Sequence, residues 1–292
     1  MRMDGQEESS NVEDVRGMGG GGGGFSFGGR GLSIGGIIIA VIAGWIFGIN
    51  PLQLLGMMEG SGSGPAVQQG PAPAPPKDDP GARFVSQVLR STEQVWTDVF
   101  RESGRTYEAP KLVLFSGSWP TACGQGQAAM GPFYCPEDRK VYIDLSFYRL
   151  LEQKLGAPGQ FAQAYVVAHE VGHHVQNLLG VMDKVDSVRS RSDRAQANAL
   201  SVRVELQADC LAGVWAARSQ KENGWRLEPG DIETALNAAA QIGDDTLQRR
   251  SQGAVVPESF THGTSAQRVN WFKRGVAGGS IERCNTFEGR DL

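Results

Sequence analysis

The chain has 292 residues with a formal net charge of −4, and 40% of its residues are hydrophobic and 21% charged. This length allows one or two domains, and the composition is that of a globular protein with one additional apolar segment. The mild charge and the lack of a concentrated basic block argue against a nucleic-acid-binding surface, so we expect no nucleic-acid partner.

The first 58 residues predict a disordered segment followed by a membrane anchor. Residues 1–30 are polar and then rich in glycine, which is typical of disorder. Residues 32–49 carry no charge, and a helix of this length spans about 27 Å, close to the roughly 30 Å hydrocarbon core of a bilayer. We therefore predict a transmembrane helix over residues 31–58 rather than a buried core helix. A cleaved signal peptide fits less well, because the charged region before the run is long and no clear small-x-small cleavage site follows it.

The positions of Lys and Arg predict the orientation of this anchor. Arg2, Arg16 and Arg30 precede the apolar run, and the first basic residue after it is Lys77. The positive-inside rule then places the N-terminus in the cytoplasm. We expect a single-pass protein of the cell membrane whose folded domain is extracytoplasmic, either periplasmic or external. Residues 59–81 mix Gly and Ser with Pro and Ala, and we expect them to form a linker.

Residues 82–292 predict a single mostly helical α+β domain, long enough to bury a core. Residues 82–104 carry an apolar stripe at helical spacing, whereas residues 111–116 and 140–145 are short apolar runs typical of strands. Further helices are expected over residues 146–155, 159–179, 193–220, 229–249 and 263–276.

The four cysteines predict two disulfides if the domain lies outside the cytoplasm. Cys123 and Cys135 would close a short, Gly-rich loop, and Cys210 and Cys284 would then tie the C-terminal segment to a central helix. The second pairing follows only by elimination. Four reduced, buried thiols would be expected in a cytosolic protein, and a cysteine zinc knuckle is unsupported because no C-x-x-C is present.

A metal-binding pattern lies in the helix expected over residues 159–179. His169-Glu170-Val171-Gly172-His173 has the form H-E-x-x-H. Residues four apart return to nearly the same helix face, so both histidines can bind one metal ion. Glu170 lies beside that ion, where it can take a proton from a water that the metal activates.

A third ligand is expected on a second helix, because catalytic zinc sites have three protein ligands and one open position. Glu205 and Asp209 are four residues apart, next to an apolar stripe of the same helix. Buried carboxylates need a partner or a metal, so we assign Glu205 as the third ligand. Asp209 is expected to accept a hydrogen bond from a ligand histidine, most reasonably His169. The alternative is a solvated helix face that pairs with Arg203 or Arg218.

Three further residues near these motifs call for an interpretation. His262 precedes the last expected helix, where it either donates a hydrogen bond to a developing oxyanion or is a helix-capping or surface residue. His174 lies about 100° around the helix from His173, so we expect a packed or hydrogen-bonding residue there. Gly172 is unfavourable within a helix, and a closely crossing helix would explain it.

The combination of HEVGHHVQ, ELQADC and HGTSAQR, after an N-terminal VEDVRG–polyglycine–apolar segment, resembles the bacterial putative neutral zinc metallopeptidase family over nearly the whole chain. More broadly, H-E-x-x-H followed by E-x-x-x-D resembles the gluzincins, which have the thermolysin-type arrangement. The resemblance implies a zincin-like core in which Zn²⁺ is held by His169, His173 and Glu205. It also implies Glu170 as general base, Asp209 behind a ligand histidine, and a catalytic contribution from His262.

The expected function is therefore that of a zinc-dependent peptidase that acts on a protein or peptide substrate without a covalent intermediate. Two alternatives stay open. One is a binding or scaffold protein that keeps a zincin fold and does not cleave, and the intact Glu170 disfavours it. The other is a metal-dependent amidase that acts on cell-wall peptides, which the sequence does not distinguish from a peptidase.

Overall fold

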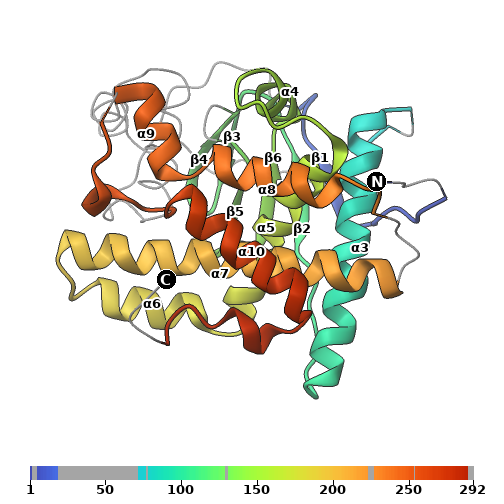
Figure 1. Ribbon diagram of the computed structural model, residues 1–292. Helices are drawn as coiled ribbons and strands as arrows, with labels where there is room; N and C mark the ends of the chain where they lie inside the picture. The colour runs from blue at the N-terminus through green and yellow to red at the C-terminus, as the bar shows by residue number, and fades with distance from the viewer. Residues whose placement is uncertain are drawn as a thin grey trace.

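The computed structural model describes residue 1 and residues 5–18, 72–76, 78–128, 131–222, 227–252 and 254–288. Helices enclose one side of a small sheet, so the mostly helical α+β class predicted from the sequence is confirmed (Figure 1). The α-helices are α3 (Pro80–Glu102), α4 (Ser146–Gln153), α5 (Gln160–Leu178), α6 (Val181–Arg189), α7 (Arg194–Glu222), α8 (Asp231–Gln241), α9 (Asp244–Gln252) and α10 (Ser265–Gly278). Two 3₁₀ turns, η2 (Pro257–Ser259) and η3 (Ile281–Cys284), flank α10.

The main sheet has the strand order β1-β2-β6-β5, in which β1, β2 and β6 are parallel and β5 is antiparallel. A separate antiparallel hairpin, β3–β4, follows β2 in the chain. The strands are β1 (Val12–Asp14), β2 (Lys111–Leu114), β3 (Ser118–Thr121), β4 (Gly124–Gln127), β5 (Phe133–Cys135) and β6 (Lys140–Ile143). The two strands predicted from apolar runs are thus the central pair. The other strands are only three or four residues long, so no apolar run predicted them.

The two faces of the sheet bury different side chains, because successive strand residues point in opposite directions. Leu112 and Leu114 of β2 belong to the large core formed with the helices. Val113 and Phe115 belong to a smaller apolar cluster, against which Trp119 of the β3–β4 hairpin packs. The sheet is therefore covered on both faces, as parallel strands require.

The N-terminal residues correct one prediction. Residues 1–30 were expected to be disordered, but β1 pairs with β2 in parallel, with Val12 opposite Leu112 and Asp14 opposite Leu114. Val12 and Val15 are buried. The segment Asn-Val-Glu-Asp-Val has only two apolar residues, so composition alone indicated a polar tail, whereas the open edge of β2 supplies the hydrogen bonds that order it.

The predicted membrane anchor over residues 31–58 lies outside the described residues, as does most of the predicted linker. Among the helices that the structure does describe, none combines the length and the apolar character needed to cross a bilayer. The first helix of the domain, α3, begins slightly earlier than the predicted residue 82, because Asp79 caps it by accepting from the N–H groups of Gly81 and Ala82 at 2.9 and 3.0 Å.

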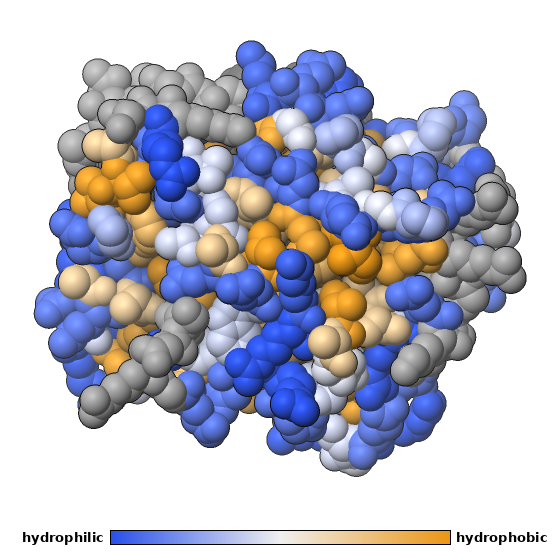
Figure 2. Space-filling model, viewed as in Figure 1, coloured by the Kyte–Doolittle hydropathy of each residue, from blue (hydrophilic) through white to orange (hydrophobic). Residues whose placement is uncertain are grey.

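Glycines set the spacing of the helices that pack around α7. A Cβ atom at Gly172 of α5 would lie 3.0 Å from the carbonyl oxygen of Ala208 in α7, which confirms the closely crossing helix expected there. A Cβ atom at Gly275 of α10 would lie only 1.9 Å from the carbonyl oxygen of Cys210. The two helices α5 and α10 thus approach α7 nearly backbone to backbone. Between α8 and α10, apolar side chains gather in a band on one face of the molecule (Figure 2).

One helix predicted over residues 229–249 is two helices, α8 and α9. The break is at Gly243, where a Cβ atom would lie 2.4 Å from the backbone nitrogen of Ser265. The start of α10 occupies the space that a continuous helix would need, so tertiary packing overrides the local helical pattern. Helix α6 was also missed, since its sequence Val-Met-Asp-Lys-Val is too short to show a clear period.

Both predicted disulfides are present, and the four cysteines are all paired. Cys123–Cys135 joins the end of the β3–β4 turn to β5, across 12 residues of sequence. Cys210–Cys284 joins α7 to η3 across 74 residues. The second bond holds the C-terminal segment against the helix that carries Glu205 and Asp209.

We expect Gly275→Ala to lower the free energy of unfolding by about 1–3 kcal/mol or more, because an overpacked methyl group must force α10 away from α7. Urea unfolding followed by tryptophan fluorescence measures this change. Gly17→Ala is the control, because its Cβ atom meets nothing within 4 Å. An equal effect of the two substitutions would contradict the close helix contact.

Candidate metal centre

Helix α5 places the H-E-x-x-H residues at the centre of the domain. It packs against α7, α8, α3 and the strands β5 and β6, so its residues are buried around its whole circumference, including His169, Glu170 and His173. Helix α7 crosses it at Gly172, which brings Glu205 opposite the two imidazoles. The predicted site residues are therefore together in the structure.

The three predicted ligands converge on one point. Nε2 of His169 lies 3.2 Å from Glu205 Oε2, and Nε2 of His173 lies 3.5 Å from Glu205 Oε1. One ligand atom from each residue lies within 4.8 Å of the others, and all three residues are buried. Two imidazole nitrogens and one carboxylate are the donor set of catalytic zinc sites. The residues therefore fit a bound divalent cation.

The second nitrogen of each histidine is held by a different kind of group. His169 Nδ1 lies 2.9 Å from Asp209 Oδ1, as predicted, and His173 Nδ1 lies 2.9 Å from Gln176 Oε1. Such bonds orient the ring so that Nε2 faces the metal position. Burial works against a charged imidazole at both positions, but the Asp209 hydrogen bond raises the pKa of His169 to about 10, whereas burial lowers the pKa of His173 to about 4.

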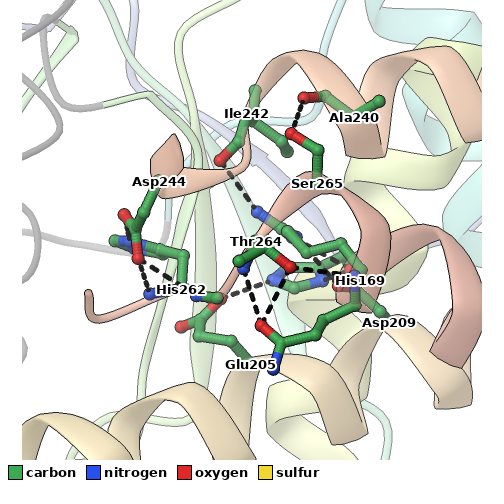
Figure 3. Close-up of polar contacts among 12 residues, drawn as sticks. His169, Glu205, Asp209, Ala240, Ile242, Asp244, His262, Thr264 and Ser265 are labelled. Atoms are coloured by element: carbon green, nitrogen blue, oxygen red, sulfur yellow. Dashed lines mark hydrogen bonds and ion pairs between the residues drawn. The ribbon is translucent and has the colours of Figure 1, made fainter. Parts of the chain in front are cut away.

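Asp209 lies at the centre of a buried polar network (Figure 3). Its carboxylate accepts from Arg268 Nε at 2.8 Å and from Arg268 Nη2 at 2.9 Å, and the hydroxyl of Tyr165 donates to it as well. Burial opposes the charge, but Arg268 and His169 hold the pKa of Asp209 below its ordinary value. The predicted alternative partners are wrong for this carboxylate, since Arg218 pairs with Glu102 and Arg203 donates to the carbonyl of Thr286.

Gln176 connects the second ligand histidine to the partner helix. Its amide nitrogen donates to the Val204 carbonyl at 2.8 Å and to Gln207 Oε1 at 2.9 Å, so its carbonyl oxygen faces His173. Gln176 stands one helical turn after His173 on α5. This spacing of three residues is the only sign of its role in the sequence, and no role was predicted for Gln176.

Glu170 follows His169 on α5 and is buried like the three ligands. Burial raises the pKa of its carboxyl group to about 8, against the opposing charge of His169. A cation held by the three ligands lowers the pKa of a neighbouring carboxyl group. The position and the burial together make Glu170 a candidate proton acceptor.

His262 is held by Asp244, a residue that was not predicted to belong to the site. Asp244 Oδ2 accepts from the backbone N–H groups of Thr261, His262 and Gly263 at 2.7, 2.6 and 3.0 Å. Asp244 Oδ1 lies 3.2 Å from His262 Nδ1, while Nε2 of the same ring is buried with no hydrogen-bond partner among the described residues. Although burial opposes protonation, Asp244 and then Glu205 raise the pKa of His262.

His174 has the structural role that its helix position indicated. Its Nε2 donates to the Glu108 carbonyl at 2.7 Å, so Nδ1 accepts from the Tyr134 hydroxyl at 3.0 Å. Burial lowers the pKa of His174 to about 4 and thus favours the neutral ring. The residue connects α5 to the edge strand β5 and to the segment before β2.

Comparisons with known proteins agree with this centre. The model of the family described as putative neutral zinc metallopeptidase matches residues 1–287. The uncharacterized protein YpfJ of Escherichia coli strain K12 is 50% identical over 291 residues, which cover 98% of this chain and 99% of the relative. The uncharacterized protein Mb2605 of Mycobacterium bovis is 43% identical over 219 residues, 72% of this chain and 73% of the relative. No solved structure matches the chain.

We expect Asp209→Asn to weaken zinc binding by about 10- to 100-fold, because the charge behind His169 is lost. Competition titration against a chelator measures the affinity, and urea unfolding checks that the variant folds. Glu102→Gln is the control, because it also removes a carboxylate that pairs with an arginine, but at the exposed Arg218 contact. Equal zinc affinity of Asp209→Asn and the wild type would show that other groups orient His169.

Proposed function

The chain belongs to the putative neutral zinc metallopeptidase family, and from this premise we propose that it hydrolyses peptide bonds with Glu170 as general base. The observation that carries the proposal is the convergence of His169 Nε2, His173 Nε2 and a Glu205 carboxylate oxygen at one buried point. A second carboxyl group, that of Glu170, is buried one residue after His169 on α5, where it interacts with the charges of His169 and Glu205, and it is not needed as a ligand. A purely structural metal site would use four protein ligands and leave no such group free.

The three ligand residues would hold Zn²⁺, the cofactor of the family. When bound, the ion supplies a Lewis acid that polarises a carbonyl group and makes water more acidic. Asp209 and Gln176 keep the two imidazoles in the orientation that this binding needs. Arg268 balances the charge of Asp209, so that the centre keeps a buried carboxylate without an unpaired charge.

Glu170 carries the proton in this proposal. Its carboxylate accepts a proton from the attacking water and returns it to the leaving amine. His262 stabilises the negative charge that develops on the oxygen of the attacked carbonyl group. Its Nε2 atom is buried without a hydrogen-bond partner among the described residues, and the Asp244 contact favours the protonated ring.

We also propose that the folded domain lies outside the cytoplasm. Two disulfides within one domain are typical of proteins outside the reducing cytoplasm, which supports an extracytoplasmic domain. The proposed reaction requires only that the substrate contain a peptide bond, and a cell-wall peptide meets this requirement. Because β1 is part of the sheet, the full chain is the proper protein for any assay, rather than a fragment that starts at residue 82.

We expect Glu170→Gln to reduce cleavage of a diverse peptide library by a factor of about 10²–10⁴, because the proton acceptor is lost. Bound zinc, measured by elemental analysis, should stay at the wild-type level. Glu152→Gln, at an exposed position of α4, is the control. Equal cleavage by Glu170→Gln and wild type would rule out this general base, and zinc binding without cleavage by any variant would favour the scaffold function.

We expect His262→Ala to lower kcat by about 10²–10³-fold with a smaller change in KM, because a donor to a developing oxyanion acts mainly in the transition state. Zinc content should not change, since His262 is outside the ligand set. Asp244→Asn should lower kcat in the same direction and to a smaller extent. If His262→Ala instead lost zinc and kept the wild-type kcat per bound zinc ion, His262 would be needed for zinc binding and not for the reaction.

A further inference from the structure

The first described segment of the chain, residues 5–18, is an integral part of the peptidase fold. β1 forms the outer strand of the sheet and pairs with β2 over three residues. Val12 is 5% exposed and lies in the large core with the helices, whereas Val15 is 4% exposed and lies in the cluster on the opposite face. The segment therefore contributes to both hydrophobic clusters of the domain.

Polar contacts fix the same segment to α3. Ser9 Oγ donates to Glu93 Oε1 at 2.5 Å, and Asn11 Nδ2 donates to the same oxygen at 2.8 Å. The Ser9 backbone also exchanges hydrogen bonds with Ser86, at 3.2 Å to its carbonyl and 3.1 Å from its hydroxyl. Glu93 and Ser86 are buried in the folded protein. The N-terminal segment therefore supplies hydrogen-bond partners for two buried polar side chains of α3.

Ion pairs fix the segment to the strands and to the start of α3. Lys140 of β6 lies 2.7 Å from Glu13, and Arg16 bridges Asp14 at 2.6 Å and Asp79 at 2.7 Å. Backbone pairing, apolar burial and charge pairing therefore agree on one position for β1. A segment attached by only one of these interactions would be easier to displace.

The pairing of β1 with β2 restricts where these two strands can lie relative to a membrane. Paired strands lie about 4.8 Å apart, whereas the hydrocarbon core of a bilayer is about 30 Å thick. A single crossing between β1 and α3 would put the two paired strands β1 and β2 on opposite sides of the bilayer. The uncharged run of residues 32–49 has the length of one helical crossing and is too short for two.

We infer that residues 5–18 and the domain that begins at α3 occupy the same side of any membrane with which the protein is associated. The inference does not depend on the peptidase activity. It differs from the orientation that the basic residues predict, in which the N-terminus is cytoplasmic and the domain is outside.

Cysteine labelling of the full chain in bacterial spheroplasts tests the inference. Gly17→Cys reports on the N-terminal segment, because Gly17 is exposed and its Cβ atom meets nothing within 4 Å. Lys184→Cys, at an exposed position of α6, reports on the domain. The native cysteines are all in disulfides and should not react. A membrane-impermeant maleimide is added before or after lysis, so that protection can be told from lack of reactivity.

We expect both variants to be labelled before lysis. If both react only after lysis, the inference holds and the extracytoplasmic location is wrong, so the two statements are tested separately. If Lys184→Cys reacts before lysis and Gly17→Cys only after it, the orientation from the basic residues is correct and the inference is overturned.

A stability measurement tests the position of β1 itself. Val12→Asp should lower the melting temperature of the purified full chain by at least about 5 °C, because it places an unpaired charge in the core. Met18→Asp is the matched control, since Met18 is 44% exposed. Equal melting temperatures of the two variants would show that β1 is not docked, and the same-side inference would then lose its basis.

Discussion

The close contact between α5 and α7 at Gly172 and Ala208 is the constraint on which the rest of the structure depends. It brings two imidazoles from one helix to a carboxylate on the other, and any side chain at Gly172 would compete with the Ala208 backbone for the same space. The i, i+4 spacing within each helix supplies the matching faces. The contact between the helices turns two separate motifs into one centre.

Charge balance explains why so many other residues surround this contact. Each buried charge in the centre has an opposite charge or a dipole within hydrogen-bonding distance, since the interior cannot solvate it. Asp209 illustrates this requirement, because its carboxylate is hydrogen-bonded to His169 and forms an ion pair with Arg268. The two ligand histidines thereby differ in character, as one is held by a carboxylate and the other by the neutral amide of Gln176. The asymmetry arises because the carboxylate comes from the partner helix α7, whereas the amide comes from α5 itself, one turn after His173.

Much of this centre was predictable from the sequence, because its ligands repeat at a helical period and buried carboxylates need partners. The main helices, the central strands, both disulfides and the positions of Glu205 and Asp209 all follow from such local or chemical signals. Arg268 and Asp244 do not, because their partners are distant in sequence and no local period marks them. The strand β1 was missed for a related reason, since its order comes from the free edge of β2 and not from its own composition.

The Asp244 carboxylate, with three consecutive backbone N–H groups bound to one of its oxygens, has a consequence for the loop that carries His262. Such a loop is rigid before any ligand arrives, and Thr264 and Gln267 continue the restraint into α10 through a capping box. The conformational entropy of this loop is therefore lost during folding and not when a ligand binds. The imidazole of His262 is thus held in one orientation in advance.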